Sequence, residues 1–234
     1  MPNDDSISIN KYIASTGVCS RREADRILDA GRVSLNGAVA KRGNRVSPGD
    51  VVLLDGKPLN AKPTTVYLAL HKPAGITCTT DRRDKTNIID YLNYPQRIFP
   101  IGRLDKPSTG LLLLTNDGDI VNKILRVENA HEKEYIVTVD KPINRTFVHK
   151  MSNGLPVLGQ ITKRCEVQKL GPKKFRIILT QGLNRQIRRM CEYLGYEVRT
   201  LKRVRIMNVR LADMEVGELR ELREDELAVL TALL

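Results

Sequence analysis

The run Leu111–Leu114 constrains the fold of this 234-residue chain more than any other stretch. It is short, continuously apolar and bounded by turn-forming residues, a pattern typical of a strand buried on both faces. Ser108-Thr109-Gly110 precedes it, and Asn116-Asp117-Gly118 turns the chain away after it. We therefore predict a rigid core strand with a tight loop at each end.

Asp105 lies on the loop that leads into this strand, between Arg103 and Lys106. A loop held by a core strand can aim a functional group accurately, so Asp105 is a candidate catalytic residue. The alternative is an ordinary loop aspartate that pairs with Arg103 or Lys106, since most loop aspartates do no chemistry.

The composition argues against several classes of protein. Hydrophobic residues make up 41% of the chain, and no apolar run approaches the roughly 18 residues needed to cross a bilayer. The short acidic start, residues 1–6, is unlike a secretory signal. The four cysteines and three histidines are scattered without a Cys-x-x-Cys pair, which argues against a metal site and against disulfides. We expect a soluble cytoplasmic protein, with no metal and no membrane partner.

The net charge of +12 is unevenly distributed along the chain. Residues 163–210 carry 14 Lys or Arg and three acidic residues, whereas residues 211–234 carry two Arg and seven Asp or Glu. A basic segment of this density is typical of a protein that binds a phosphate backbone, because without a polyanion its charges repel one another. The charge favours a nucleic acid as partner.

Residues 7–54 show the pattern of a small unit with two helices and a hairpin. Ser20 and Glu23 form a capping-box pattern ahead of the second helix, which Gly31 ends, and Asn36-Gly37 is a favoured hairpin turn. This order of motifs resembles the S4 RNA-binding domain, which implies that the basic helix face grips structured RNA through phosphates. The candidate RNA-binding residues of this unit are Lys11, Ser20, Arg21, Arg22, Arg26 and Arg32.

Residues 55–65 are rich in Pro, Gly and Lys, and we predict a linker there. Residues 66–234 mix strands and helices without regular alternation, which predicts an α+β domain on a largely antiparallel sheet. The predicted strands cover residues 66–71, 76–79, 111–115, 135–139, 165–170, 174–180 and 197–210. The predicted helices cover residues 87–93, 118–126, 144–152, 183–194 and 224–233.

The segment 183–194 predicts a basic amphipathic helix. Its apolar residues fall on one face, while Arg185 and Arg189 point away from it and Arg188 lies near the boundary. Arg188 can therefore reach inward to a carboxylate. A guanidinium beside Asp105 would keep the carboxylate ionised and fixed in direction.

Four ordered motifs resemble those of RNA pseudouridine synthases of the RsuA type. They are His71-Lys72-Pro73-Ala74-Gly75, where the family commonly has asparagine in place of His71, the stretch 102–111 around Asp105, Lys133-Glu134-Tyr135, and residues 183–190. Residues 131–135 and 205–209 look most like the RluF branch, which modifies 23S ribosomal RNA. The resemblance implies an S4 domain over residues 7–54 and a larger catalytic domain over residues 66–234, on a mostly antiparallel mixed sheet with flanking helices.

The resemblance also implies a reaction and roles for residues. Pseudouridine formation breaks the N1–C1′ bond of a flipped uridine and rejoins the base through C5, without a cofactor. Asp105 corresponds to the catalytic aspartate, acting as nucleophile at the sugar or as the base that removes a sugar proton. Arg103 would enter the space that the base leaves, Tyr135 would stack on the base, and Arg188 would pair with Asp105. Leu183, Arg185 and Ile187 would contact substrate, and Lys72, Lys133 and Arg189 would serve the RNA.

Other functions are weighed beside this one. The same chemistry on another ribosomal RNA or on transfer RNA is one alternative, and a non-catalytic S4 protein associated with the ribosome is another. A base-excising glycosylase or a nuclease is a third, although a nuclease would want clustered acidic residues for metal. We expect a monomer that acts on structured RNA.

Overall fold

The computed structural model describes residues 5–59, 63–126 and 130–234. The chain divides into two compact units. The first consists of the residues up to Thr65 together with Tyr94–Arg97, and the second of Val66–Asn93 and Ile98–Leu234. No helix of the described residues is long and apolar enough to cross a membrane.

The first unit packs two helices, α1 (Ile9–Ser15) and α2 (Arg21–Asp29), on a small core. The Ser20 hydroxyl caps α2 by accepting a hydrogen bond from the Glu23 N–H at 3.1 Å, which confirms half of the predicted capping box. The Glu23 carboxylate binds Arg26 instead, at 2.9 Å. Gly31, with φ of 67°, follows the end of α2 as predicted.

Two hairpin turns of the same kind build the four-stranded sheet of this unit, in the order β3-β2-β5-β6. Asn36 and Gly37 have φ of 50° and 85°, as the predicted turn requires, and connect β2 (Val33–Leu35) to β3 (Ala38–Val39). Asp55 and Gly56 have φ of 49° and 77° and connect β5 (Val52–Leu54) to β6 (Lys57–Pro58). The prediction of a linker from residue 55 was therefore wrong at its start, since Asp-Gly forms a turn here and the chain after it pairs with the sheet. A two-residue pair, β1 (Ile7–Ser8) with β4 (Arg45–Val46), completes this unit.

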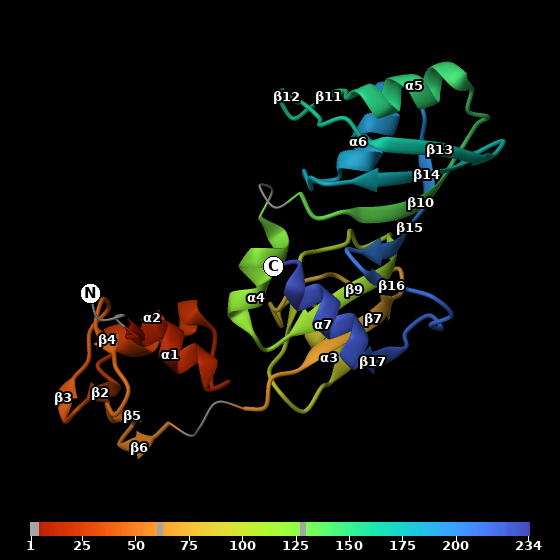
Figure 1. The fold of residues 1–234 in the computed structure, drawn as a ribbon. Coiled ribbons are helices and arrows are strands. Elements are labelled where there is room, and N and C mark those ends of the chain that lie inside the picture. The colour runs from red at the N-terminus through yellow and green to blue at the C-terminus, as the bar shows by residue number, and fades with distance from the viewer. Residues whose placement is uncertain (1–4, 60–62, 127–129) are drawn as a thin grey trace. The chain divides into compact units, whose positions relative to one another are not determined.

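The second unit is built on a nine-stranded mixed sheet (Figure 1). The strands follow the order β13-β14-β10-β15-β9-β7-β17, with β16 paired to β15 and β8 paired to β9. All of these pairs are antiparallel except β15 with β9. The predicted α+β class and mostly antiparallel sheet are confirmed. The strands are β7 (Tyr67–Lys72), β8 (Phe99–Ile101), β9 (Thr109–Thr115), β10 (Lys133–Val139), β13 (Glu166–Gly171), β14 (Lys174–Leu179), β15 (Val198–Ile206), β16 (Val209–Arg210) and β17 (Leu219–Glu221).

The helices are α3 (Ile88–Leu92), α4 (Gly118–Leu125), α5 (Arg145–Asn153), α6 (Gln186–Tyr193) and α7 (Glu224–Ala232). Each matches a predicted helix, but α6 begins at Gln186 because Arg185 takes a left-handed conformation, with φ of 52°. Two predicted strands differ from the structure. Residues 76–79 form no strand, because the backbone of Thr77 bonds to the neighbouring loop at Thr86 and Ile88. The segment 197–210 is two strands, because Met207, with φ of 50°, turns the chain between β15 and β16.

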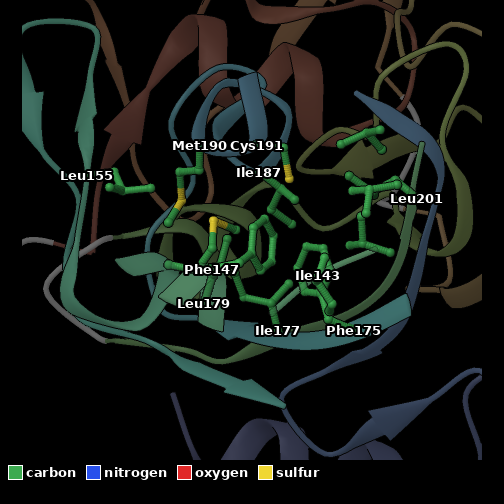
Figure 2. Close-up of a cluster of buried hydrophobic side chains, with 14 of the residues drawn as sticks. Ile143, Phe147, Leu155, Phe175, Ile177, Leu179, Ile187, Met190, Cys191 and Leu201 are labelled. Carbon is green, nitrogen blue, oxygen red and sulfur yellow. The ribbon is translucent and has the colours of Figure 1, made fainter. Parts of the chain in front are cut away.

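Apolar side chains from α5 and α6 meet those of β10, β14 and β15 in one buried cluster (Figure 2). Phe147 and Phe175 pack edge to face at 5.2 Å between ring centroids, and Ile187 and Met190 reach the cluster from α6. Burial raises the pKa of the Cys191 thiol to about 12, so this side chain stays protonated and packs as an apolar group. The cluster holds α6 against the sheet and so determines where its arginines point.

The centre of the sheet brings β9 and β15 into unusually close contact. Gly110 lies opposite Arg203 in the parallel pair and has φ of 110°. A Cβ atom at Gly110 would lie 2.2 Å from the Arg203 carbonyl oxygen. Only glycine fits here, and this contact places the loop before β9 beside β15.

Candidate active site

Asp105 lies on the loop between β8 and β9, at the wall of a cavity of about 540 Å³. The Ser108 N–H donates to the Asp105 carbonyl oxygen at 2.9 Å, which closes a turn around the aspartate. The Leu104 N–H donates to the Cys78 Sγ at 3.4 Å and ties the other side of the loop to residue 78. The Asp105 side chain keeps 30% of its surface exposed, so the carboxylate is held by its backbone and open to the cavity.

Arg188 lies beside this carboxylate, as predicted. Its Nε lies 3.5 Å from the Asp105 Oδ2, and its Nη2 donates to the Ser108 hydroxyl at 3.1 Å. The Arg188 side chain is 10% exposed, and its Nη1 donates to the Val198 carbonyl at 3.4 Å. A second guanidinium, the Nη1 of Arg185, lies 3.9 Å from the same carboxylate oxygen. These two positive charges stabilise the ionised carboxylate.

Lys72 corrects a prediction. We expected its ammonium to contact RNA phosphate, but the side chain is fully buried at the end of β7. Its Nζ donates to the carbonyl oxygens of Pro73 at 2.7 Å and Ser108 at 2.9 Å, with those of Asp105 and Lys106 at 3.5 and 3.4 Å. Burial lowers the pKa of Lys72. Lys72 therefore stabilises the loop that carries Asp105 by bonding to its backbone carbonyl oxygens.

Arg203 is a part of the site that the sequence analysis missed. It is 3% exposed on β15, and its Nε donates to the Leu111 carbonyl at 2.7 Å. Its Nη1 donates to the Arg103 carbonyl at 3.4 Å. Arg203 thus binds the chain on both sides of the Asp105 loop. The only sequence signal was an arginine between Lys202 and Val204 in a predicted strand, which gives no hint of these partners.

Apolar side chains form another part of the cavity wall. Tyr135 is half-buried on β10, and Ile187 is buried on α6. Both line the cavity together with Leu183, Leu179 and Leu201. The structure therefore brings the predicted substrate-binding residues to one cavity, namely Arg103, Tyr135, Leu183, Arg185, Ile187 and Arg188.

Two further residues that were predicted to contact RNA, Lys133 and Arg189, lie in different surroundings. Lys133 faces the cavity, and its Nζ donates to the His131 carbonyl at 3.2 Å. Burial, and next the charge of Arg203, lower the pKa of Lys133. Arg189 does not line the cavity, and its guanidinium instead bonds to Asn184 through Nε at 3.0 Å. A short turn before α6 brings Asn184 within reach, and sequence spacing did not reveal it.

The predicted basic residues of the first unit lie in varied surroundings. Arg21 and Arg22 are exposed at the start of α2, whereas Lys11 is half-buried. Arg26 pairs with Glu23, and Arg32 donates to both carboxylate oxygens of Asp55, through its Nε and its Nη2. The Ser20 hydroxyl is engaged as the cap of α2.

The cavity wall is strongly positive. Asp105 is its one carboxylate in the described part of the chain, against six basic side chains: Arg103, Lys106, Lys133, Arg185, Arg188 and Arg203. Nowhere in residues 5–59, 63–126 and 130–234 do three His, Cys, Asp or Glu side chains gather as metal ligands. A positive cavity with an apolar wall and one carboxylate suits a nucleotide with its phosphates outside and its base within.

Comparisons with known proteins agree with this geometry. Residues 66–193 match the family model for RNA pseudouridylate synthase, and residues 8–52 match the S4 domain. The chain is 55% identical over 233 residues to the dual-specificity RNA pseudouridine synthase RluF of Escherichia coli (strain K12), covering 99% of this chain and 80% of the relative. The chain belongs to the RNA pseudouridine synthase family.

Other members of the family are similar over almost the same extent. Ribosomal large subunit pseudouridine synthase B of Bacillus subtilis (strain 168) is 35% identical, with 96% of each chain covered. A crystal structure of a pseudouridylate synthase superposes with a TM-score of 0.70 at 29% identity, covering 96% of this chain and all of the other. Like its family, this RNA pseudouridine synthase isomerises uridine to pseudouridine in RNA. The predicted enzyme class and the predicted S4 unit are confirmed.

Proposed function

We propose that Asp105 is the single catalytic carboxylate of this enzyme and that its target is a uridine of 23S ribosomal RNA. The observation that carries the catalytic role is the placement of Asp105 as the one carboxylate on a cavity wall lined by basic side chains. A glycosidase places two carboxyl groups across the bond that it hydrolyses, whereas an internal rearrangement needs one.

The chemistry conserves every atom of the nucleotide. The N1–C1′ bond breaks, the uracil turns within the site, and C5 bonds to C1′; C5 then loses its proton to solvent, while N1 takes up one proton from solvent, so the composition of the nucleotide is unchanged. Asp105 either attacks C1′ or takes a proton from the sugar, and both routes use the ionised carboxylate. Arg188 and Arg185, at 3.5 and 3.9 Å from Oδ2, stabilise that charge before the substrate arrives.

The apolar part of the cavity wall binds the flipped base and replaces the stacking contacts that the base loses in the RNA. The Tyr135 ring and the Ile187 side chain provide apolar surface to the flipped uracil. Extruding the base costs a few kcal/mol, which these contacts offset. Arg103 is exposed at the cavity and enters the space that the base leaves in the RNA.

The first unit binds structured RNA through phosphates. Arg21 and Arg22 present two exposed guanidinium groups at the start of α2, and Lys11 lies on the neighbouring helix α1. Arg26 and Arg32 already have carboxylate partners, so their contribution to phosphate binding is smaller. Such contacts give affinity for folded RNA without reading its sequence.

The relatives support the choice of RNA. One is named as a ribosomal large subunit pseudouridine synthase, and another as a dual-specificity RNA pseudouridine synthase. We therefore propose the large-subunit ribosomal RNA as the main target and a second RNA class, such as transfer RNA, as a further one. A cytoplasmic location is part of this proposal, since the enzyme has to meet these RNAs.

Tritium release tests the proposal. Transcripts of 23S ribosomal RNA and of transfer RNA labelled at uridine C5 are incubated with the enzyme, with Asp105→Asn and with Asp213→Asn. Asp213 is an exposed aspartate outside the cavity, so its variant is the matched control. We expect release from the 23S transcript to fall by at least about 10⁴-fold in Asp105→Asn while RNA binding is retained. Release by Asp105→Asn at the rate of the control would refute the catalytic role, and no release from 23S RNA by the wild type would refute the target.

A further inference from the structure

The strands β10 and β15 are neighbours in the centre of the sheet (Figure 1), and their pairing is irregular beside the cavity. Tyr135 of β10 lies opposite Arg203. The residue before it, Glu134, lies opposite Arg205 and not opposite Val204, which is left without a partner in β10. An extra residue of this kind is a β-bulge, and bulges beside active sites often redirect a side chain.

The bulge determines which side chains of β15 reach the cavity. Successive side chains of a regular strand alternate between the two faces of its sheet. Leu201 and Arg203, two residues apart, both line the cavity, but the next residue of β15 that lines it is Ile206. Without the extra residue, Arg205 would face the cavity and Ile206 would face away from it.

Arg205 is held on the opposite face of the sheet by three acceptors. Its Nε donates to the Oε2 of Glu134 at 2.8 Å and its Nη2 to the Oε2 of Glu132 at 2.9 Å. Its Nη1 donates to the Met207 carbonyl oxygen at 2.8 Å. Tyr135 lines the cavity, whereas its strand neighbour Glu134 and Arg205 do not. The guanidinium of Arg205 therefore points away from the cavity.

Glu134 connects the bulge to the strand on its other side, β14. Its Oε1 accepts a hydrogen bond from the Arg176 Nε at 2.8 Å, while its Oε2 accepts the one from Arg205. The side chains of Glu134 and Arg205 are each 12% exposed. Burial alone would raise the pKa of Glu134, but hydrogen bonds from the two arginines leave it below its usual 4.5. A charged carboxylate thus uses both of its oxygens to bridge β14 and β15.

This ion pair fixes a direction more than it adds stability. A partly buried ion pair often stabilises a fold no more than an apolar pair of the same volume does. Each of the three Arg205 nitrogens has its own acceptor, so the side chain cannot turn without breaking hydrogen bonds. The bulged residue is held as well, since the Val204 carbonyl oxygen accepts a hydrogen bond from the Leu211 N–H at 2.8 Å.

The contacts of Arg203 show what the bulge provides to the active site. Arg203 donates to the Leu111 carbonyl oxygen at 2.7 Å and to the Arg103 carbonyl oxygen at 3.4 Å, on the two sides of Asp105 in the chain. A shift of the bulge by one residue would carry Arg203 to the other face of the sheet. Both carbonyl oxygens of the Asp105 loop would then lose this donor.

We propose that Glu134 and Arg205 are positioning residues for the reaction, which hold the β15 bulge and so keep Arg203 against the loop that carries Asp105. Neither residue touches the nucleotide. Both act through Arg203 on the placement of the carboxylate, and not on the affinity for RNA. This inference rests on the proposed catalytic role of Asp105, because it explains how that residue is held.

The test compares Glu134→Gln with Glu226→Gln in the full chain, by tritium release and by filter binding of RNA. Glu226 is the matched control, because it pairs with Arg220 in the same unit, is 5% exposed and does not line the cavity. At a temperature where both variants are folded, we expect the kcat of Glu134→Gln to fall roughly 10- to 100-fold, since a displacement of about 1 Å can cost that much. Its KM and its Kd for RNA should stay within about twofold of the wild type, and Glu226→Gln should keep kcat within about twofold.

Amide hydrogen exchange gives a readout that does not depend on activity. Exchange in residues 102–110 should become about tenfold faster in Glu134→Gln and should stay unchanged in Glu226→Gln. Arg205→Gln should match Glu134→Gln, and the two changes together should lose no more kcat than either alone, because both break the same contact. If Glu134→Gln does not fold, Arg205→Lys replaces it; this variant keeps the charge but has one nitrogen in place of three, so its kcat should fall by about threefold or more.

Two results would overturn the positioning role. One is a kcat of Glu134→Gln equal to that of Glu226→Gln, and the other is weaker RNA binding by Glu134→Gln with kcat unchanged. Asp105→Asn in the same assay separates this proposal from the proposed function. Tritium release by Asp105→Asn at the wild-type rate would refute the catalytic role itself. An inactive Asp105→Asn beside a Glu134→Gln that matches its control would refute the positioning role alone.

Discussion

Replacing Gly110 with alanine tests whether close contact between β9 and β15 holds the active-site loop. The added Cβ would lie 2.2 Å from the Arg203 carbonyl oxygen and 2.5 Å from its nitrogen, whereas ordinary contacts begin near 3.4 Å. Both atoms are backbone in the middle of a sheet, so they can move little. Overpacking of this kind costs about 1–3 kcal/mol. Alanine at a φ of 110° adds about 1–3 kcal/mol of strain.

The two terms together predict a loss of about 4 kcal/mol, or roughly 8–16 °C in melting temperature for a domain of this size. Circular dichroism measures the melting temperature, and tritium release at 20 °C measures activity. We expect kcat to fall with stability, because the same contact positions Arg203 beside the Asp105 loop. Gly171→Ala is the control, since Gly171 lies in β13 with an ordinary φ and its Cβ would meet only Lys174 at 3.8 Å. A melting temperature of Gly110→Ala within about 3 °C of this control would refute the reasoning.

Three further predictions concern Lys72, Glu226 and the first unit. Lys72→Met should lower the free energy of unfolding by roughly 2–4 kcal/mol and reduce kcat, because buried carbonyls lose their donor. Its RNA affinity, measured by filter binding, should stay within about twofold of the wild type. Weaker RNA binding with unchanged stability would instead indicate that Lys72 contacts a phosphate. Burial alone would raise the pKa of Glu226, but hydrogen bonds from Arg220 and from the Arg223 N–H leave it below the usual 4.5. The stabilisation by Glu226 is therefore complete above pH 4.5 and is lost as the pH falls through the lowered pKa. Urea unfolding should show Glu226→Gln less stable than the wild type at pH 7, and this difference in the free energy of unfolding should close towards pH 3. Deleting residues 1–65 should weaken binding to folded RNA and make its salt dependence shallower, while calorimetry shows an intact transition for the remaining unit; loss of that transition would contradict independent folding.

Local chemistry made much of the fold predictable. The Ser20 cap and the Asn36-Gly37 turn depend on a few neighbouring residues, and each forms as expected. The run Leu111–Leu114 is fully buried in β9, because its apolar residues and bounding turns leave no other stable arrangement. Asp55-Gly56 forms the same two-residue hairpin turn as Asn36-Gly37. The sequence analysis assigned it to a linker because the surrounding segment is rich in proline and glycine.

Long-range contacts explain the predictions that failed. Lys72 looks like any basic residue in a Lys-Pro turn, and only the packing of the Asp105 loop over it turns its ammonium toward carbonyl oxygens. Arg203 lies about a hundred residues from the loop that it binds, so no local sequence pattern could predict this contact.

The amino-acid sequence alone therefore predicted which reaction this protein catalyses. It supplied an aspartate on a loop before a leucine strand, the basic segments, and motifs specific enough to identify an RNA pseudouridine synthase. Only the folded sheet decided how that aspartate is held. Three features from distant parts of the chain meet at the Asp105 loop. They are the parallel pairing of β9 with β15 at Gly110, the buried ammonium of Lys72, and Arg188 on α6. Sequence patterns report local preferences, whereas the electrostatic surroundings of one carboxylate depend on every element that packs around it.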